Sequence, residues 1–228
     1  MGRPQKPPEY HPRVMMTDWV DADSSAGVRY LLLADISGYT AFMSGVEEAH
    51  GVDFSGGVPA GYGVLAALLD AVVEGVQPDF DVAKLEGDAV FAVAPADTLD
   101  GRGESLLEHL RSVHRAFRAR RWDARSARDH VCTACPVVSN LDLKMVLHRG
   151  PVVRQTVGSR SELLGSAVNV AHRLLKNTVA SRIGYRPYLL LTDAAADGLG
   201  LPEVGLSHRE DYPDVGPIEG RIVELDDS

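Results

Sequence analysis

The chain of 228 residues is 45% hydrophobic and 24% charged, which suits one α/β domain with additions, or at most two small domains. Its formal net charge of −9 excludes broad nucleic-acid binding, which requires a basic surface. No apolar run approaches the roughly 20 residues that span a bilayer, so we expect neither nucleic acid nor a membrane as a partner.

Residues 1–27 are predicted to form an extended N-terminal arm, because Pro4, Pro7, Pro8 and Pro12 interrupt any helix there. This arm lacks the apolar segment of a secretion signal. Together with the low cysteine content discussed below, that favours a cytoplasmic location.

Hydrophobic periodicity predicts strands and helices in mixed order along the remaining residues, 28–228. The predicted strands are 28–34, 81–85, 89–94, 141–148 (with 151–157 extending or following it), 188–192 and 221–225. The predicted helices are 39–50, 64–76, 106–122, 164–177 and 193–198. This order indicates one domain in which helices pack over a mixed sheet. The arginine-rich segment 111–128 is typical of a solvated helix face; a dimer or nucleotide contact is the alternative.

Two aspartates stand where predicted strands end. Asp35 follows the apolar strand, and Asp88 lies at a hairpin tip in which Gly87 supplies the tight turn. If the strands are neighbours, the two carboxylates converge at one sheet edge, as a phosphate-bound metal site requires. The structural alternative is that Asp35 caps the next helix and that Asp88 belongs to the turn.

A third group of candidate residues lies on one predicted helical face. Asn169, Arg173 and Lys176 occupy positions i, i+4 and i+7. An amide, a guanidinium and an ammonium in line could bind a triphosphate, since the planar guanidinium of arginine can donate two hydrogen bonds to phosphate oxygens. An ordinary polar helix face is the alternative.

These segments resemble the conserved motifs of class III adenylate and guanylate cyclases. Residues 32–40 (LLADISGYT) resemble the first metal motif, residues 84–90 (KLEGDAV) the second, and residues 164–173 (LGSAVNVAHR) the helix that holds the transition state. The resemblance spans about residues 28–225. It implies an α/β (α+β), ferredoxin-like nucleotide cyclase fold with a mixed central sheet and helices packed on it.

The chain resembles an uncharacterised bacterial branch of that superfamily still more closely. The shared marks are Glu86, the Cys132–Cys135 pair, Leu143-Lys144 before residues 148–150 (HRG), and residues 172–177 (HRLLKN). Membership of this branch leaves the activity open.

The cyclase resemblance implies a two-metal mechanism with Mg²⁺ or Mn²⁺. Asp35 and Asp88 would hold the ions with help from the backbone carbonyl of Ile36. Asn169 would position the ribose, and Arg173 would stabilise charge developing on the phosphates of the substrate.

The resemblance also implies which nucleotide base is bound and which oligomer forms. Lys84 and Glu162 would face the base, which favours ATP over GTP, and Lys176 is a further candidate contact for the substrate. In this family the metal-binding aspartates and the Asn/Arg pair come from different subunits, so a homodimer is implied.

Three features depart from the cyclase pattern. Glu162 is one methylene longer than the usual aspartate. The stretch 214–217 lacks the phosphate-binding lysine found in many cyclases, a role that Lys176 or an arginine would have to fill. The segment 118–138 is longer than a simple connection and is predicted to be an insertion.

Cys132 and Cys135 leave three interpretations open. They are ordinary reduced cysteines, half of a zinc site completed by His130 or His148 and a second subunit, or a redox pair. His148 and His172 are predicted to be structural rather than catalytic.

The leading functional hypothesis is a signalling enzyme that converts ATP to cyclic AMP and pyrophosphate. The alternatives are a catalytically silent cyclase-like module that binds nucleotide or a protein partner, and another metal-dependent phosphoryl transfer on the same scaffold.

Overall fold

The computed structural model describes residues 25–50, 57–126 and 135–226. Its centre is an eight-stranded mixed sheet with the order β2-β3-β1-β4-β6-β8-β7, to which β5 is added by pairing with β4. β4 and β6 are parallel, and the other paired strands are antiparallel. The strands are β1 (Ser25–Ser37), β2 (Asp81–Glu86), β3 (Ala89–Pro95), β4 (Asp142–Val157), β5 (Arg160–Leu164), β6 (Tyr188–Thr192), β7 (Leu206–Tyr212) and β8 (Gly216–Glu224).

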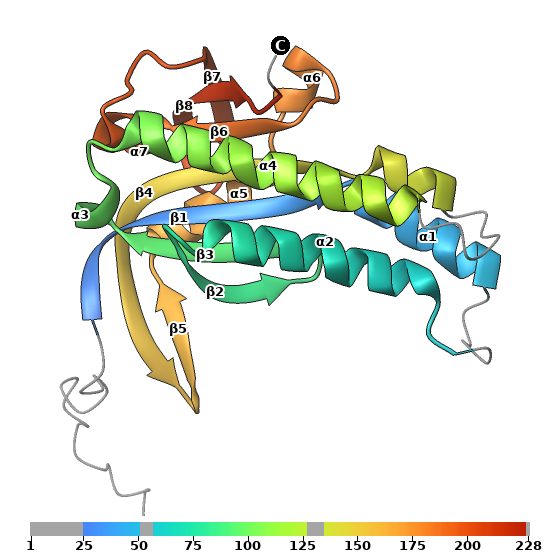
Figure 1. Ribbon diagram of the computed structural model, residues 1–228. Helices are drawn as coiled ribbons and strands as arrows, with labels where there is room; N and C mark the ends of the chain where they lie inside the picture. Colours follow the sequence, from blue (N-terminus) through green and yellow to red (C-terminus); the bar gives the residue numbers. More distant parts are fainter. Residues whose placement is uncertain (1–24, 51–56, 127–134, 227–228) are drawn as a thin grey trace, which may run out of the picture.

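Helices cover both faces of this sheet (Figure 1). The helices are α1 (Tyr39–His50), α2 (Ala60–Val76), α3 (Ala96–Leu99), α4 (Gly103–Ser126), α5 (Ser166–Leu174), α6 (Val179–Ile183) and α7 (Asp193–Leu199), with a 3₁₀ helix at Cys135–Asn140. None of the helices in the described ranges has the length and apolar content needed to cross a bilayer.

The sheet separates two hydrophobic cores. Strand alternation sends Leu32 and Ala34 of β1 toward the larger core, which contains side chains of α1, α2 and α4. Leu31 and Leu33 point to the smaller core, which contains side chains of α5. Because β1 is buried on both faces, its sequence is an unbroken apolar run rather than an alternating pattern.

Most predicted elements are confirmed, and the differences have physical causes. The predicted strand 151–157 is the second half of β4, where it pairs with β5, a strand that the sequence pattern did not predict. β7 was also missed, because this edge strand of the sheet is mostly polar. The predicted helix 164–177 is shorter, since α5 ends at Leu174. The predicted insertion 118–138 starts inside α4, which continues to Ser126.

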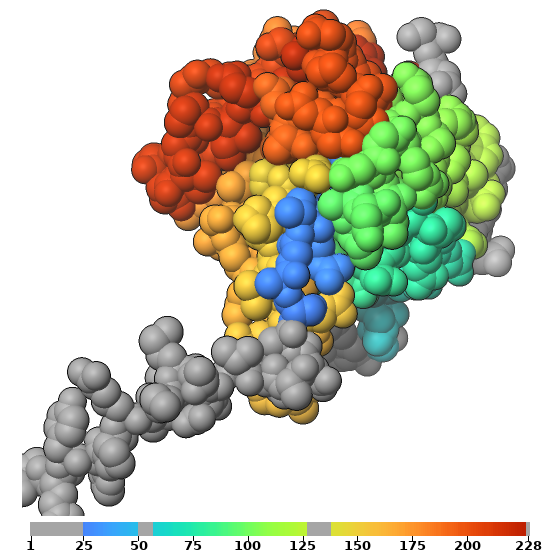
Figure 2. Space-filling model, turned by 90° about the vertical axis from the view of Figure 1, so that its left-hand side faces the viewer, coloured from blue at the N-terminus to red at the C-terminus, as the bar shows by residue number. Residues whose placement is uncertain are grey.

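The end of β4 and the short β5 form a hairpin that projects from the body of the molecule (Figure 1). The first residues of β1 pair with β4 near the base of this hairpin, in the register Ser25↔Arg154. Figure 2 shows this beginning of β1 at the surface, beside β4. The opposite end of β1 carries Asp35, so the strand crosses the full width of the domain.

Candidate functional site

The two predicted metal-binding aspartates lie on adjacent strands. β1 pairs with β3 in the register Asp35↔Ala89, which places Asp35 beside the turn that contains Asp88. The backbone N–H of Ile36 donates a hydrogen bond to the carbonyl of Asp88 over 3.2 Å, while the Ile36 side chain is buried in the larger core. The sequence hypothesis that both aspartates meet at one sheet edge therefore agrees with the geometry.

The electrostatics of this edge involve Lys144, for which the sequence motifs predict no role. Lys144 of β4 lies directly opposite Asp35, and its Nζ is 3.0 Å from Asp35 Oδ2. Burial, followed by the negative charge of Asp35, raises the pKa of Asp88 above the ordinary aspartate value. The carboxylates of Asp35 and Asp88 are thus close together and partly buried, and the ammonium of Lys144 neutralises part of their negative charge. An all-oxygen donor pair of this kind fits Mg²⁺ or Mn²⁺ completed by phosphate oxygens.

A glycine turn leads from this edge into α1. Gly38 has a φ of +85°, and a Cβ atom there would approach the carbonyl oxygen of Asn140 to 2.8 Å, so only glycine fits without strain. Beside the turn is a cavity of about 630 Å³, whose wall includes Ser37, Gly38, Lys144 and Tyr188. This volume lies in the range of small-molecule sites.

Helix α5 presents the predicted polar stripe. Asn169 and Lys176 are exposed, with Lys176 just past the C-terminal end of the helix. Arg173 is half-exposed and forms an ion pair with Asp214, in the turn between β7 and β8. This is the stretch that lacks the phosphate-binding lysine of many cyclases, so a carboxylate contacts Arg173 where the family pattern would place a cation.

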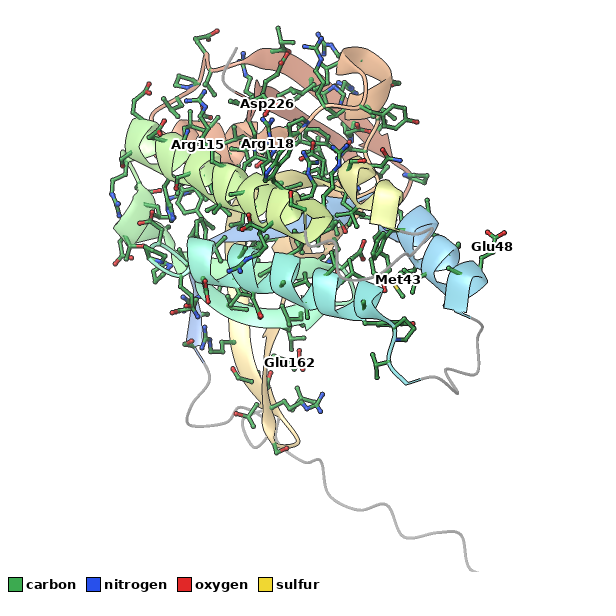
Figure 3. The ribbon with its side chains drawn as sticks, turned by 45° about the vertical axis from the view of Figure 1, so that its right-hand side comes forward. Met43, Glu48, Arg115, Arg118, Glu162 and Asp226 are labelled. Atoms are coloured by element: carbon green, nitrogen blue, oxygen red, sulfur yellow. The ribbon has the colours of Figure 1, made fainter. Side chains whose placement is uncertain are left out.

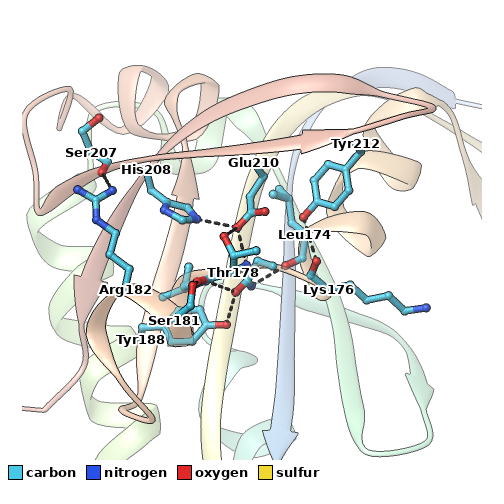
Figure 4. Close-up of polar contacts among 12 residues, drawn as sticks. Leu174, Lys176, Thr178, Ser181, Arg182, Tyr188, Ser207, His208, Glu210 and Tyr212 are labelled. Atoms are coloured by element: carbon cyan, nitrogen blue, oxygen red, sulfur yellow. Dashed lines mark hydrogen bonds and ion pairs between the residues drawn. The ribbon is translucent and has the colours of Figure 1, made fainter.

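The connection after α5 is fixed to β7 by buried polar contacts (Figure 4). Glu210 is 5% exposed, and one of its oxygens accepts hydrogen bonds from the backbone N–H and the hydroxyl of Thr178, at 2.6 and 2.8 Å. His208 Nε2 lies 2.7 Å from the same oxygen. The Tyr212 hydroxyl also donates to the carbonyl of Lys176. These contacts hold the end of α5 in a defined position relative to the β7–β8 turn.

A second polar group lies on β2, on the same face of the sheet as α5. Lys84 Nζ is 2.7 Å from Glu86 Oε1, and Glu86 Oε2 is 3.3 Å from Nδ1 of His172 on α5. The buried ring of Phe91 lies beneath them, 5.9 Å from Lys84 Nζ and 5.2 Å from the His172 ring, measured to ring centroids. Glu86 therefore connects Lys84 to His172 of α5.

Glu162, the other predicted base contact, lies on the projecting hairpin (Figure 3). Its register partner is Gln155 of β4. The next residue, Leu163, packs against the smaller core, so strand alternation turns Glu162 to the opposite face of the hairpin. Among residues 25–50, 57–126 and 135–226, no hydrogen bond or ion pair joins Glu162 to Lys84.

Of the histidines and cysteines considered for a structural or zinc-binding role, the structure describes His148 fully. His148 is largely buried, its Nδ1 is 3.0 Å from the hydroxyl of Thr192, and burial lowers its pKa to about 4, in agreement with a structural role. Cys132, His130 and the side chain of Cys135 lie outside the described residues, and so does the zinc hypothesis. Within the described ranges, no three His, Cys, Asp or Glu side chains cluster as metal ligands.

Several arginines of α4 take part in surface ion pairs. Arg115 pairs with Glu108, and Arg118 pairs with Asp226 near the end of the chain (Figure 3). These contacts agree with the prediction of a solvated helix face.

The fold is cyclase-like, and solved structures agree. A bacterial light-regulated adenylyl cyclase matches with a TM-score of 0.59 and 19% identity, over 89% of this chain and 53% of that one, so the present chain spans about half its length. The guanylyl cyclase Cya2 matches with a TM-score of 0.62 and 13% identity, over 87% and 92% of the two chains. A class III adenylyl cyclase-like ATP-binding protein from Pseudomonas aeruginosa has a TM-score of 0.55 and 16% identity, over 81% and 37%. The predicted cyclase fold class is confirmed.

The sequence family is narrower than the fold. The model of the family described as "Protein of unknown function (DUF2652)" matches residues 65–183, about half of the chain. The uncharacterized protein Rv2561/Rv2562 of Mycobacterium tuberculosis is 31% identical over 165 residues, which cover 71% of this chain and 73% of that protein. The chain belongs to this family, a branch with the class III cyclase fold.

Proposed function

We propose that the protein is a nucleotide cyclase that converts ATP to cyclic AMP and pyrophosphate as a homodimer. The observation that carries this proposal is the meeting of Asp35 and Asp88 at one sheet edge, with the ammonium of Lys144 against Asp35. Structural carboxylates are seldom placed where a neighbouring carboxylate raises the pKa, as Asp35 raises that of Asp88, whereas a site for cations and phosphates uses such an arrangement.

The chemistry divides among residues of this chain. Bound by Asp35 and Asp88, two Mg²⁺ or Mn²⁺ ions would neutralise phosphate charge and favour ionisation of the ribose 3′-hydroxyl. The 3′-oxygen forms a bond to the α-phosphorus as the bond to the β-phosphate oxygen breaks and pyrophosphate leaves. Asn169 orients the ribose, Arg173 donates hydrogen bonds to the phosphates, and Lys144 adds a positive charge beside them.

A homodimer is proposed because the projecting hairpin carries exposed apolar side chains. Val153, Val157 and Leu164 are 40%, 55% and 45% exposed. A second copy of the chain that covered them would bury apolar surface. The family resemblance implies an assembly in which α5 of one subunit faces the aspartates of the other.

The alternative is a catalytically silent module that binds nucleotide. The ion pair between Arg173 and Asp214 favours it, because a carboxylate near the phosphates opposes their binding. The cyclase-like neighbour from P. aeruginosa carries the description ATP-binding protein, which supports nucleotide binding as a function of this fold.

The test is a cyclase assay on the purified protein with Mg²⁺ or Mn²⁺, with ATP and GTP tested separately. Asp88→Ala is the inactivating variant, and Asp97→Ala, at an exposed aspartate of α3, is its matched control. We expect cyclic AMP from wild type and from Asp97→Ala, and none from Asp88→Ala. ATP binding without product would favour the silent module. Folded protein that neither binds nor converts nucleotide would refute both functions.

A further inference from the structure

The polar group on β2 points to a specificity-determining residue that the family motif does not predict. We propose that Glu86, rather than Glu162, is the carboxylate that reads the base, accepting a hydrogen bond from the exocyclic amine of adenine while Lys84 donates to the adjacent ring nitrogen N1. This inference rests on the proposed function, and it names a residue of the same site.

Geometry supports Glu86 first. Lys84 and Glu86 are two residues apart on one strand, so both side chains project from the same face, and their charged ends are 2.7 Å apart. A donor and an acceptor side by side match the adjacent N1 acceptor and amine donor of adenine. Both groups keep hydrogen-bonding capacity beyond their mutual contact, since an ammonium has three donors and a carboxylate about four acceptor positions.

The position of Glu86 relative to α5 is the second argument for its role. Its second oxygen is 3.3 Å from His172, which is adjacent in sequence to Arg173 and one helical turn from Asn169. The carboxylate is thus held beside the helix that carries the proposed ribose and phosphate contacts. Glu162, in contrast, faces away from this core on the hairpin.

Burial supports Glu86 last. The Glu86 side chain is 28% exposed and that of Lys84 is 46% exposed, so both are open to a ligand yet partly shielded from water. Phe91, 1% exposed, forms the apolar base of the group. Partial shielding strengthens the hydrogen bonds of charged groups, so the pair can discriminate between bases.

The experiment compares binding of ATP with that of purine riboside triphosphate, in which a hydrogen replaces the amine of adenine and N1 remains an acceptor. Affinities would be measured by competition against a fluorescent ATP analogue for the wild-type chain and for the variants Glu86→Gln, Glu86→Leu and Glu162→Gln. Glu203→Gln, at a glutamate that is 90% exposed, is the matched control. Circular dichroism and thermal melting would establish that each variant is folded.

We expect wild type and Glu203→Gln to prefer ATP by about tenfold, the value of one hydrogen bond to a charged group. Glu86→Leu should bring the ratio of the two affinities close to one by weakening ATP binding. Glu86→Gln should lower this ratio in part. An unchanged preference in folded Glu86→Leu would overturn the inference and leave the proposed function intact. A preference for ATP that is lost only in Glu162→Gln would have the same consequence. No nucleotide binding by wild type would instead overturn the proposed function, and the inference with it.

Discussion

Replacing Lys144 with methionine removes the ammonium group from Asp35 while keeping most of the volume of the side chain. In wild type this ammonium also donates a hydrogen bond to the carbonyl of Leu175 over 3.2 Å, so it links the aspartate edge to the end of α5. Without it, Asp35 and Asp88 face each other with no compensating cation. We expect the Lys144→Met variant to be less stable without metal and more responsive to divalent cations.

The size of the effect follows from the burial of the pair. The side chains of Lys144 and Asp35 are 23% and 16% exposed, between the surface and the interior. Exposed pairs contribute about 0–1 kcal/mol, and loss of one partner of a buried pair costs about 3–5 kcal/mol. We therefore expect Lys144→Met to lose about 2 kcal/mol in the free energy of unfolding. For a domain of this size that lowers Tm by roughly 4–8 °C.

The assay is thermal melting of wild type and variant, with and without millimolar Mn²⁺. Because Lys144 competes with cations for Asp35, Mn²⁺ should raise the Tm of Lys144→Met more than that of wild type. Arg209→Met, which breaks the exposed ion pairs of Arg209 with Asp211 and Glu219, is the control and should respond to Mn²⁺ as wild type does. A Lys144→Met protein with wild-type Tm and a wild-type response to Mn²⁺ would refute the reasoning.

Three further predictions concern the phosphate contact, the metal edge and the buried histidine. Asp214→Asn frees Arg173 and should raise ATP affinity by up to about fivefold in low salt, because a half-exposed ion pair is worth at most about 1 kcal/mol; equal affinities in a fluorescence titration would contradict this. Because the pKa of Asp88 is raised by burial and then by Asp35, protons should compete with Mn²⁺ above the pH range of an ordinary aspartate. Calorimetry should therefore show Mn²⁺ affinity still rising with pH above that range. Asp35→Asn should move that rise to lower pH, and an unchanged curve would count against the coupling. Burial lowers the pKa of His148 from 6.5 to about 4, so its contribution to stability is complete above pH 6.5 and is lost as the pH falls to about 4. In urea unfolding, wild type should lose roughly 3 kcal/mol of unfolding free energy over that pH window, and His148→Gln should not show this loss. The same pH profile in wild type and His148→Gln would argue against a role of His148.

The sequence predicts the aspartate edge well because strand ends and tight turns are local features. The apolar run before Asp35 and the glycine before Asp88 determine where each carboxylate lies along the chain, and antiparallel pairing of β1 with β3 brings them together. The polar stripe of α5 is predictable for a similar reason, since the period of a helix alone places Asn169 and Arg173 on one face.

Contacts between distant segments could not be predicted in this way. Lys144 occupies an ordinary alternating strand, and its position opposite Asp35 depends on the register between β1 and β4. The partner of Arg173 is Asp214, 41 residues later, in a turn before a strand that the pattern predicted only in part. Glu86 is a mark of the bacterial branch in the sequence, but its contacts with Lys84 and His172 depend on β2 and α5 sharing one face of the sheet.

The length of β1 has a mechanical consequence. From Ser25 to Asp35 the strand covers about 33 Å at 3.3 Å per residue, and β4 is hydrogen-bonded beside it along that whole distance. One ladder of backbone hydrogen bonds therefore connects the place where the chain enters β1 to the aspartate edge, so a pull applied at the first residues of β1 acts on the two strands that carry Asp35 and Lys144. Anything joined to the chain before Ser25 would also begin far from that edge, leaving room for a tether or a dye that does not obstruct the site.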